Sequence, residues 1–301
     1  MDAKPRLRDL SKKRVDGTER GDSVPTWAIQ GNMRLEVGVP RGVDTTFLGD
    51  YVEKAVATAS RQAPRGQANT GFDIAERVAM MCASALFSGL TEKELLEIAS
   101  CAKARSFAQD ELLFMQGQSA QNLVLIHSGS VKLSQTSENG SEVILWMTGS
   151  NQPVGVPSEN SPCSHTCSAR AMEKCKASVW EYRKLQDLML EYPLIRKNIS
   201  SILAHRLDEL QERFREVATE KVARRLALAL LRLVKQVGKP AYPGTEVALS
   251  RDELAQMIGT TLFTISRMLS KWGDEGFVEP RRGSVVVLDA KRLAQVSEAD
   301  D

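Results

Sequence analysis

Residues 250–272 read SRDELAQMIGTTLFTISRMLSKW, and this stretch decides the fold of the C-terminal part of the chain. Ser250 is followed three residues later by Glu253, which is the spacing of a capping box that opens a helix. Gly259 stands where a helix that ends in a left-handed residue needs a glycine. Thr261 can cap the start of a second helix. The stretch therefore predicts two short helices joined by a tight turn.

The apolar residues of this stretch indicate how the two helices pack. Ala255, Gly259 and Ile265 have the spacing of a helix-turn-helix, which needs a small residue where the helices cross, a glycine in the turn and an apolar residue that docks the second helix. The predicted buried faces are Leu254, Ala255 and Ile258 in the first helix and Ile265, Met268, Leu269 and Trp272 in the second. An unrelated helical hairpin is the alternative.

Residues 276–289, GFVEPRRGSVVVLD, predict two short strands about a turn at Arg282-Gly283. Such a β-wing follows the second helix in winged-helix domains. Basic residues lie where such a domain meets phosphates: Arg267 and Lys271 on the second helix, and Arg281 and Arg282 in the wing. Plain solvated charges are the alternative for the wing pair. We assign residues 218–301 to a winged helix-turn-helix domain that binds DNA.

A helical stretch from about residue 184 to residue 237 precedes this domain, with a break at Pro193. Five of its apolar residues recur at steps of 4, 3, 4 and 3, which is the a/d seam of a two-stranded coiled coil. They are Leu203, Leu207, Leu210, Phe214 and Val217. A neighbouring stripe of Ile195, Ile199 and Ile202 can face the rest of the chain. We predict a dimerisation helix over residues 184–217 and a homodimer; burial of both stripes within one monomer is the alternative.

Upstream of that helix the sequence changes to short strand-like runs with Gly-containing turns between them. The runs are ELLFM (111–115), NLVLIH (122–127), SVKLSQT (130–136), EVILWM (142–147) and ASVWEYR (177–183). Strands at this spacing, without helices between them, predict a small barrel or jelly roll. Two short helices come before it, the second opened by a capping box at Thr91 and Glu94. We assign residues 73–183 to a β-roll sensor domain with flanking helices, which makes the protein an α+β protein.

The first 72 residues differ in composition from the rest, because charged, turn-rich and small polar stretches alternate without a periodic apolar face. We predict a largely disordered N-terminal extension over residues 1–72. Residues 48–59 could form a short helix, since Leu48, Val52 and Val56 recur at helical spacing. The basic cluster at residues 12–14 is a solvated tail or a contact to nucleic acid.

The composition is that of an ordinary soluble globular protein, with 40 Lys+Arg against 38 Asp+Glu and 42% hydrophobic residues among the 301. No apolar run approaches the roughly 20 residues of a membrane-spanning helix, and no signal-peptide core follows Met1, so we expect a cytoplasmic protein without a membrane partner. Five cysteines, an odd number, fit reduced thiols. No Gly-rich phosphate loop, nucleophile elbow or paired-carboxylate motif is present, which argues against an enzyme.

The order of these parts resembles the family of the cyclic-AMP receptor protein and the Fnr-type regulators of bacteria. The resemblance covers about residues 84–294. It rests on LFSGLTEKELLEIA, LIHSGSVKLSQTSENGSEVILWMTGS, AHRLDELQERF, RRLALALLRLVKQ and LSRDELAQMIGTTLFTISRML. The resemblance implies a homodimeric transcription regulator with a cyclic-nucleotide-binding-like jelly roll, whose paired second helices enter successive major grooves of a palindromic operator. RNA polymerase is an implied partner.

The positions that would hold a cyclic nucleotide in this family carry other residues here. The family's Gly-Glu pair falls on Gly155 and Val156, and its Arg-Ser or Arg-Thr pair falls on His165 and Thr166. A ribose acceptor and a phosphate-binding guanidinium are therefore both missing. The family's adenine-binding hydroxyls fall on Leu210 and Gln211. These six residues are our candidate effector pocket, and we expect an unknown small-molecule or redox signal rather than cyclic AMP.

A cysteine cluster raises the alternative of a redox, metal or iron–sulfur response. PCSHTCSARAMEKC offers Cys163, His165, Cys167 and Cys175, which are soft ligands at short spacing. The spacing matches no standard zinc or iron–sulfur motif, so reduced structural thiols are the preferred interpretation. Haem through His127 or His165 is a further alternative. The cofactor is left open.

The predicted recognition residues are Thr261, Leu262, Phe263, Ser266, Arg267 and Lys271. In the resembling families an acidic residue stands three positions before the Ser-Arg or Gly-Arg pair and accepts from cytosine. That position is Phe263 here, which can make only apolar contacts, for example to a thymine methyl. We therefore expect an operator that differs from the usual half-site. Loss of DNA readout, leaving an interaction protein, is the alternative.

Overall fold

The computed structural model describes residues 73–156 and 164–298. The predicted N-terminal extension, the possible helix at residues 48–59 and the basic cluster at residues 12–14 lie outside the described residues. Cys163 also lies outside them. Within the described part, no helix is long and apolar enough to cross a membrane.

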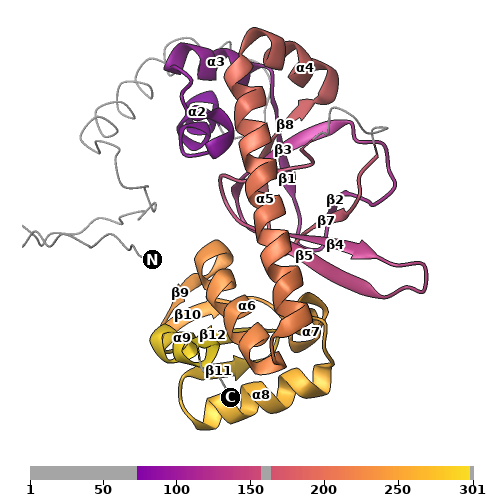
Figure 1. Ribbon diagram of the computed structural model, residues 1–301. Coiled ribbons are helices and arrows are strands. Elements are labelled where there is room, and N and C mark those ends of the chain that lie inside the picture. The colour runs from indigo at the N-terminus through magenta and orange to yellow at the C-terminus, as the bar shows by residue number, and fades with distance from the viewer. Residues whose placement is uncertain (1–72, 157–163, 299–301) are drawn as a thin grey trace, which may run out of the picture. The chain divides into compact units, whose positions relative to one another are not determined.

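Eight strands form the predicted β-roll as two four-stranded antiparallel sheets (Figure 1). One sheet has the order β1-β8-β3-β6 and the other the order β2-β7-β4-β5. The strands are β1 (Lys103–Phe107), β2 (Leu112–Phe114), β3 (Asn122–Ser128), β4 (Val131–Thr136), β5 (Glu142–Thr148), β6 (Pro153–Val154), β7 (Ser168–Ala171) and β8 (Cys175–Glu181). Buried side chains such as Phe107, Ile126 and Val131 form an apolar core in the roll. The predicted α+β fold class is confirmed.

Within the roll, the strands that the sequence did not predict are β1, β6 and β7. The sequence of β7, SARA, has no bulky apolar residue, and three of the five residues of β1 are exposed. Both strands are held by their neighbours, because β7 pairs with β2 and β4 and β1 pairs with β8. The predicted strand at residues 177–183 ends at Glu181, since Tyr182 begins a helix.

Helices that flank the roll build a second apolar core. They are α2 (Ile74–Cys82), the 3-10 turn η1 (Ala85–Phe87), α3 (Glu92–Ser100), α4 (Tyr182–Glu191) and α5 (Pro193–Thr219). The predicted capping box of α3 is present, with Glu94 Oε2 accepting from Thr91 N at 2.6 Å. Trp180 is fully buried between roll and helices and donates from Nε1 to Ile98 O at 2.9 Å.

The predicted break at Pro193 is confirmed, because α4 ends at Glu191 and Pro193 begins α5. A second break, three residues after the end of the predicted dimerisation helix at residue 217, separates α5 from α6 (Val222–Val237). Glu220 is extended there, with φ −101° and ψ 147°. Glu216 of α5, buried at 3% exposure, binds Arg232 of α6 with N–O distances of 2.5 and 2.8 Å. This ion pair braces the corner between the two helices.

The C-terminal part contains one four-stranded antiparallel sheet, in the order β11-β12-β10-β9, and four helices among the described residues. Its elements after α6 are β9 (Lys239–Ala241), β10 (Gly244–Val247), α7 (Arg251–Ile258), α8 (Leu262–Asp274), β11 (Val278–Arg281), β12 (Ser284–Val287) and α9 (Ala290–Glu298). The amphipathic helix α6 buries Leu226, Leu230 and Leu233 in the apolar core of this part. Ile144 and Met147 of β5 belong to the same core, so the roll packs directly on these helices.

Candidate functional site

The turn between α7 and α8 has the predicted helix-turn-helix geometry. Ser250 Oγ accepts from Glu253 N at 3.2 Å, and Glu253 Oε2 accepts from Ser250 N at 2.9 Å, which completes the capping box. Gly259 ends α7 in the left-handed conformation, with φ 66°, where a side chain would add strain. Thr261 Oγ1 accepts from Thr264 N at 3.3 Å and caps α8. These local predictions are confirmed.

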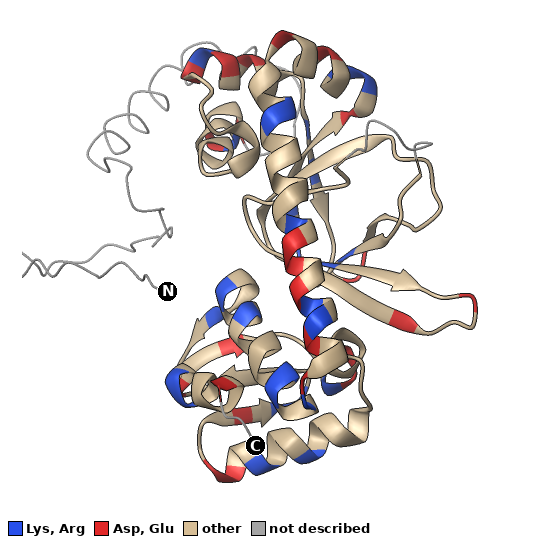
Figure 2. Cartoon of the chain, in the orientation of Figure 1, with Lys and Arg blue, Asp and Glu red and all other residues tan. Residues whose placement is uncertain are grey.

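Helix α8 presents one face to solvent and buries the other. Ile265, Leu269 and Trp272 are buried, and Met268 is half-buried against the same core. The opposite face holds the predicted recognition residues, which are exposed except for the half-buried Ser266: Thr261, Leu262, Phe263, Ser266, Arg267 and Lys271. Phe263 is 84% exposed, although burial of an aromatic ring is normally favourable. Basic residues lie along this helix (Figure 2).

The exposed cations of α8 differ in their neighbours. Arg267 has no ion pair within the described part of the chain. Lys271 Nζ lies 3.9 Å from Glu275 Oε1, and both side chains are solvent-exposed, so this pair is weak. Arg267 is thus available to an external anion or base edge without breaking an internal pair.

The wing is present, with β11 and β12 joined by a turn at Gly283, but its two arginines differ. Arg281 Nε donates to Glu279 Oε1 at 2.7 Å, and its guanidinium lies 4.0 Å from Glu246 Oε1. The hydrogen bond to Glu279 raises the pKa of Arg281, and the same bond lowers the pKa of Glu279. Arg282, at the tip, is exposed and has no ion pair among the described residues. The structure therefore favours Arg282 over Arg281 as a phosphate contact.

The predicted dimerisation stripe is exposed along α5. The exposed fractions are 39% for Leu203, 54% for Leu207, 40% for Leu210, 75% for Phe214 and 50% for Val217. Ile195 and Ile199 are buried against the roll helices. The alternative that both stripes are buried within one chain is wrong, since the a/d seam is open to solvent in the monomer.

Two of the six predicted effector residues meet inside the roll. Gly155 has φ +71°, and a Cβ there would lie 2.9 Å from Asn122 O and 3.5 Å from His165 Cε1. The His165 ring stacks on Phe114, with centroids 3.7 Å apart and planes at 11°. Burial lowers the pKa of His165, so the stacked ring is neutral near pH 7 and cannot act as a fixed cation for a phosphate.

The other four predicted effector residues are dispersed. Val156 is half-buried against the helix core. Thr166 is exposed, and its carbonyl accepts from Gln135 Nε2 at 2.9 Å. Leu210 and Gln211 are exposed on α5. The structure therefore does not bring the six residues together in one pocket.

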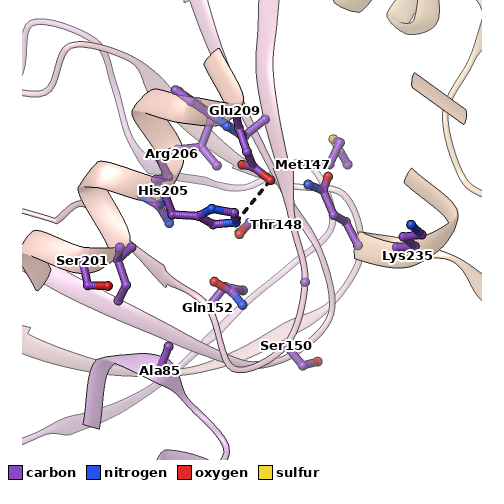
Figure 3. A pocket seen from close by; sticks show the side chains of 15 residues that line it. Ala85, Met147, Thr148, Ser150, Gln152, Ser201, His205, Arg206, Glu209 and Lys235 are labelled. Carbon is purple, nitrogen blue, oxygen red and sulfur yellow. Dashed lines mark ion pairs between the residues drawn. The ribbon is translucent and has the colours of Figure 1, made fainter. Parts of the chain in front are cut away.

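A pocket that the sequence did not predict lies between the roll, α5 and α6 (Figure 3). Its volume is about 540 Å3. Arg206 of α5 lines it and donates from Nη2 to Pro153 O at 2.6 Å. None of the six predicted effector residues lines this pocket. The sequence signal was weak, because the lining residues come from separate segments and Arg206 is one of many arginines in the helical stretch.

The described cysteines are free thiols. Cys175 is buried, and its Sγ donates to Ser130 O at 3.4 Å. Burial raises the pKa of Cys175 and of Cys167, which keeps both protonated near pH 7. The described part of the chain holds no group of three or more His, Cys, Asp or Glu side chains that could bind a metal. Cys163, the remaining thiol of the predicted cluster, lies outside the described residues.

His127, one of the two haem-ligand candidates, is 3% exposed. Its Nε2 lies 2.7 Å from Ser178 Oγ. Burial, with a smaller contribution from Arg77, lowers its pKa to about 4. His127 is thus a neutral, hydrogen-bonded core residue, and this geometry does not favour axial ligation.

Two family models match this chain. Residues 224–296 match the Crp-like helix-turn-helix domain, and residues 104–192 match the cyclic nucleotide-binding domain. The cyclic AMP receptor protein of Thermus thermophilus is 30% identical over 217 residues, which is 72% of this chain and 98% of the relative.

Solved structures share the fold. FixK2 from Bradyrhizobium japonicum aligns with a TM-score of 0.58 and 21% identity, over 66% of this chain and 99% of FixK2. The c-di-GMP responsive global regulator CLP of Xanthomonas campestris aligns with a TM-score of 0.58 and 24% identity, over 66% of this chain and all of CLP (100%).

Proposed function

The chain belongs to the Crp family of DNA-binding transcription regulators, and from this premise we propose that it acts as a homodimer in the cytoplasm. In this proposal, residues 73–183 sense a signal, residues 184–217 dimerise and residues 218–301 bind DNA, while residues 1–72 form an extension. The family is one of transcription regulators rather than enzymes.

The observation that carries the proposal is the exposed face of α8. This face presents Leu262, Phe263 and Arg267 to solvent, while Ile265, Leu269 and Trp272 are buried on the other face. In a helix-turn-helix, the N-terminal residues of the second helix contact base edges. Two such helices in a dimer would bind half-sites about 34 Å apart on a palindromic operator.

The residues of this surface would have different roles. Arg267 can donate two hydrogen bonds to guanine, and Phe263 can contact a thymine methyl. Thr261, Ser266 and Lys271 would bind phosphates or sugars near the helix, and Arg282 would bind a phosphate beside the wing. Arg281 would contribute less, because Glu279 already neutralises it.

The dimer would form through the exposed stripe of α5. Leu203, Leu207 and Leu210, continued by Phe214 and Val217, would pack against the same residues of a second copy, because a two-fold axis pairs identical surfaces. Pairing them would remove five large apolar side chains from water. The dimer would also fix the distance between the two copies of α8.

The signal is proposed to be something other than cyclic AMP. The relative from Thermus thermophilus is named for cyclic AMP, but Val156 and His165 stand where this family needs a ribose acceptor and a guanidinium. The stacked His165 and Phe114 rings also occupy space beside Gly155. Titration calorimetry with cyclic AMP tests this point, and a micromolar dissociation constant would contradict it. RNA polymerase is the proposed protein partner.

Selection of binding sites from random duplex DNA tests DNA readout. We expect a palindromic consensus with two half-sites one helical turn apart. Arg267→Ala should weaken binding by about 1 to 3 kcal/mol per half-site and relax preference at one base pair. Phe263→Glu should move the consensus towards a half-site with cytosine at the contacted position. Two results would show that α8 does not recognise the DNA sequence. One is that no sequence is enriched, and the other is that the Arg267 variant selects the parental site with parental affinity.

A further inference from the structure

Phe263, the second residue of α8, extends an aromatic ring into solvent. The residue is 84% exposed, whereas Ile265, Leu269 and Trp272 on the opposite face of the helix are buried. Burial of an aromatic ring is one of the largest apolar contributions that a single side chain can make to stability. Because the fold does not bury this ring, the ring is available for contact with something outside the chain.

The polar groups in the first turn of α8 are engaged within the chain. Thr261 Oγ1 accepts from Thr264 N at 3.3 Å and lies 3.0 Å from Thr264 Oγ1, so the two hydroxyls bind each other. The first turn of α8 contains no acidic residue. In the major groove, base edges offer hydrogen-bond donors, acceptors and one apolar group, which is the C5 methyl of thymine. An exposed phenyl ring in this turn matches the apolar group.

Phe263 and Arg267 lie four residues apart on α8 and therefore on the same face. The Cβ atoms of such a pair are about 5 to 6 Å apart. Base pairs stack about 3.4 Å apart, so the two side chains would contact the same or neighbouring base pairs. Arg267 has no ion pair within the described part of the chain, and a free guanidinium can donate to O6 and N7 of guanine.

We propose that Phe263 recognises the C5 methyl group of a pyrimidine next to the guanine that Arg267 binds, and that either thymine or 5-methylcytosine supplies this methyl group. The proposal rests on the proposed function, because it requires α8 to lie in the major groove. Methylation at C5 gives cytosine the apolar group that thymine carries at the same groove edge. Binding would thus depend on the methylation state of the operator.

Four duplexes that differ in one pyrimidine test the proposal. The half-site selected from random duplex DNA supplies the sequence, and Arg267→Ala identifies the guanine. The neighbouring pyrimidine is then thymine, uracil, 5-methylcytosine or cytosine. Thymine against uracil and 5-methylcytosine against cytosine each isolate one methyl group, because base pairing is the same within each pair. In fluorescence anisotropy with the full chain, the methylated member should bind about fourfold tighter per half-site, the effect of burying one methyl group.

Two variants separate recognition of the methyl group from general affinity for DNA. Phe263→Ser should bring both affinity ratios to about one, because it removes the apolar ring that contacts the methyl group. Lys271→Gln is the control, since Lys271 is an exposed cation about two turns further along the same row. It should weaken all four duplexes alike and leave both ratios unchanged.

Equal binding within both pairs, or unchanged ratios in Phe263→Ser, would overturn the proposal. An effect in the thymine pair alone would support recognition of thymine and exclude 5-methylcytosine as a ligand. A change in the oligomeric state of Phe263→Ser, measured by sedimentation without DNA, would instead assign the ring to an interface between two copies. Failure of the proposed function differs from these results, because no duplex would then be enriched or bound, and both proposals would be wrong.

Discussion

Lys132 Nζ, on strand β4 of the roll, donates to Glu253 Oε1, in the first turn of α7, at 3.1 Å. The two side chains are only 11% and 19% exposed. Glu253 also closes the capping box of α7 through Ser250. One carboxylate therefore caps the first helix of the helix-turn-helix and anchors that helix to the β-roll.

Lys132→Met should lower the free energy of unfolding by about 2 kcal/mol, because the Glu253 carboxylate loses its cationic hydrogen-bond donor in a largely buried place. Urea denaturation followed by tryptophan fluorescence measures the change. Lys103→Met is the matched control: its ion pair with Glu181 is 2.5 Å long but its side chains are 77% and 63% exposed, so its removal should cost less than about 1 kcal/mol. Equal destabilisation in the two variants would contradict the expectation that the buried ion pair contributes more to stability than the exposed one.

Stability should fall between pH 7.5 and pH 5 because of His127. Its pKa is about 4 in the folded chain and about 6.5 when unfolded. Between these values the unfolded chain binds a proton that the folded chain does not, so stability rises with pH in this window and is lost as the pH falls. The two pKa values correspond to about 2 kcal/mol between pH 7.5 and pH 5.

Denaturation of the His127→Gln variant at pH 7.5 and at pH 5 tests whether His127 causes this pH dependence of stability. The variant should lose most of the pH dependence, whatever its stability at pH 7.5. His205→Gln changes a histidine whose side chain is 76% exposed, and it should keep the parental pH dependence. If the His127 variant keeps that dependence too, another group is responsible.

The wing arginines should affect DNA binding unequally. Arg282→Ala should weaken all duplexes alike and reduce the slope of log affinity against log salt by about one for each phosphate that the protein no longer neutralises. Arg281→Ala should have a smaller effect, because its charge is paired with Glu279 in the free protein. Gel-shift titrations at several salt concentrations measure both slopes. A larger effect of Arg281→Ala than of Arg282→Ala would show that the ion pair between Arg281 and Glu279 breaks when the protein binds DNA.

Leu210→Lys should convert the proposed dimer to monomer at micromolar concentration, because it places a charge in the centre of the apolar stripe, where burial without a partner is costly. Sedimentation equilibrium measures the change. Leu190→Lys is the control, since Leu190 is 72% exposed on α4, outside the stripe. A fully dimeric Leu210 variant would place the interface elsewhere.

The helix-turn-helix was predictable residue by residue because its signals are local. Ser250, Glu253, Gly259 and Thr261 each act within a few residues of themselves, through caps and a left-handed turn. The strand β7 was not predictable, since its sequence SARA has no periodic apolar pattern. It is extended because it pairs with β2 and β4 on either side.

The candidate sites also differ in whether a local sequence pattern marks them. The exposed stripe of α5 follows a regular spacing and was predicted, whereas the residues that line the pocket come from the roll, α5 and α6, which no local pattern links. A boundary at residues 217–218 was predicted, but the ion pair that holds the corner at Glu220 was not. It depends on Glu216 and Arg232, which meet only after the chain has turned.

Helix α6 meets α5 at a corner at Glu220, and a rotation about this corner moves α6 as a rigid rod. The 16 residues of α6, at about 1.5 Å each, give an arm of about 24 Å. A rotation of about 10° at this corner would sweep the far end through about 4 Å, more than the rise of about 3.4 Å between neighbouring bases. The Glu216–Arg232 ion pair spans this corner, so it sets how easily α6 rotates about Glu220.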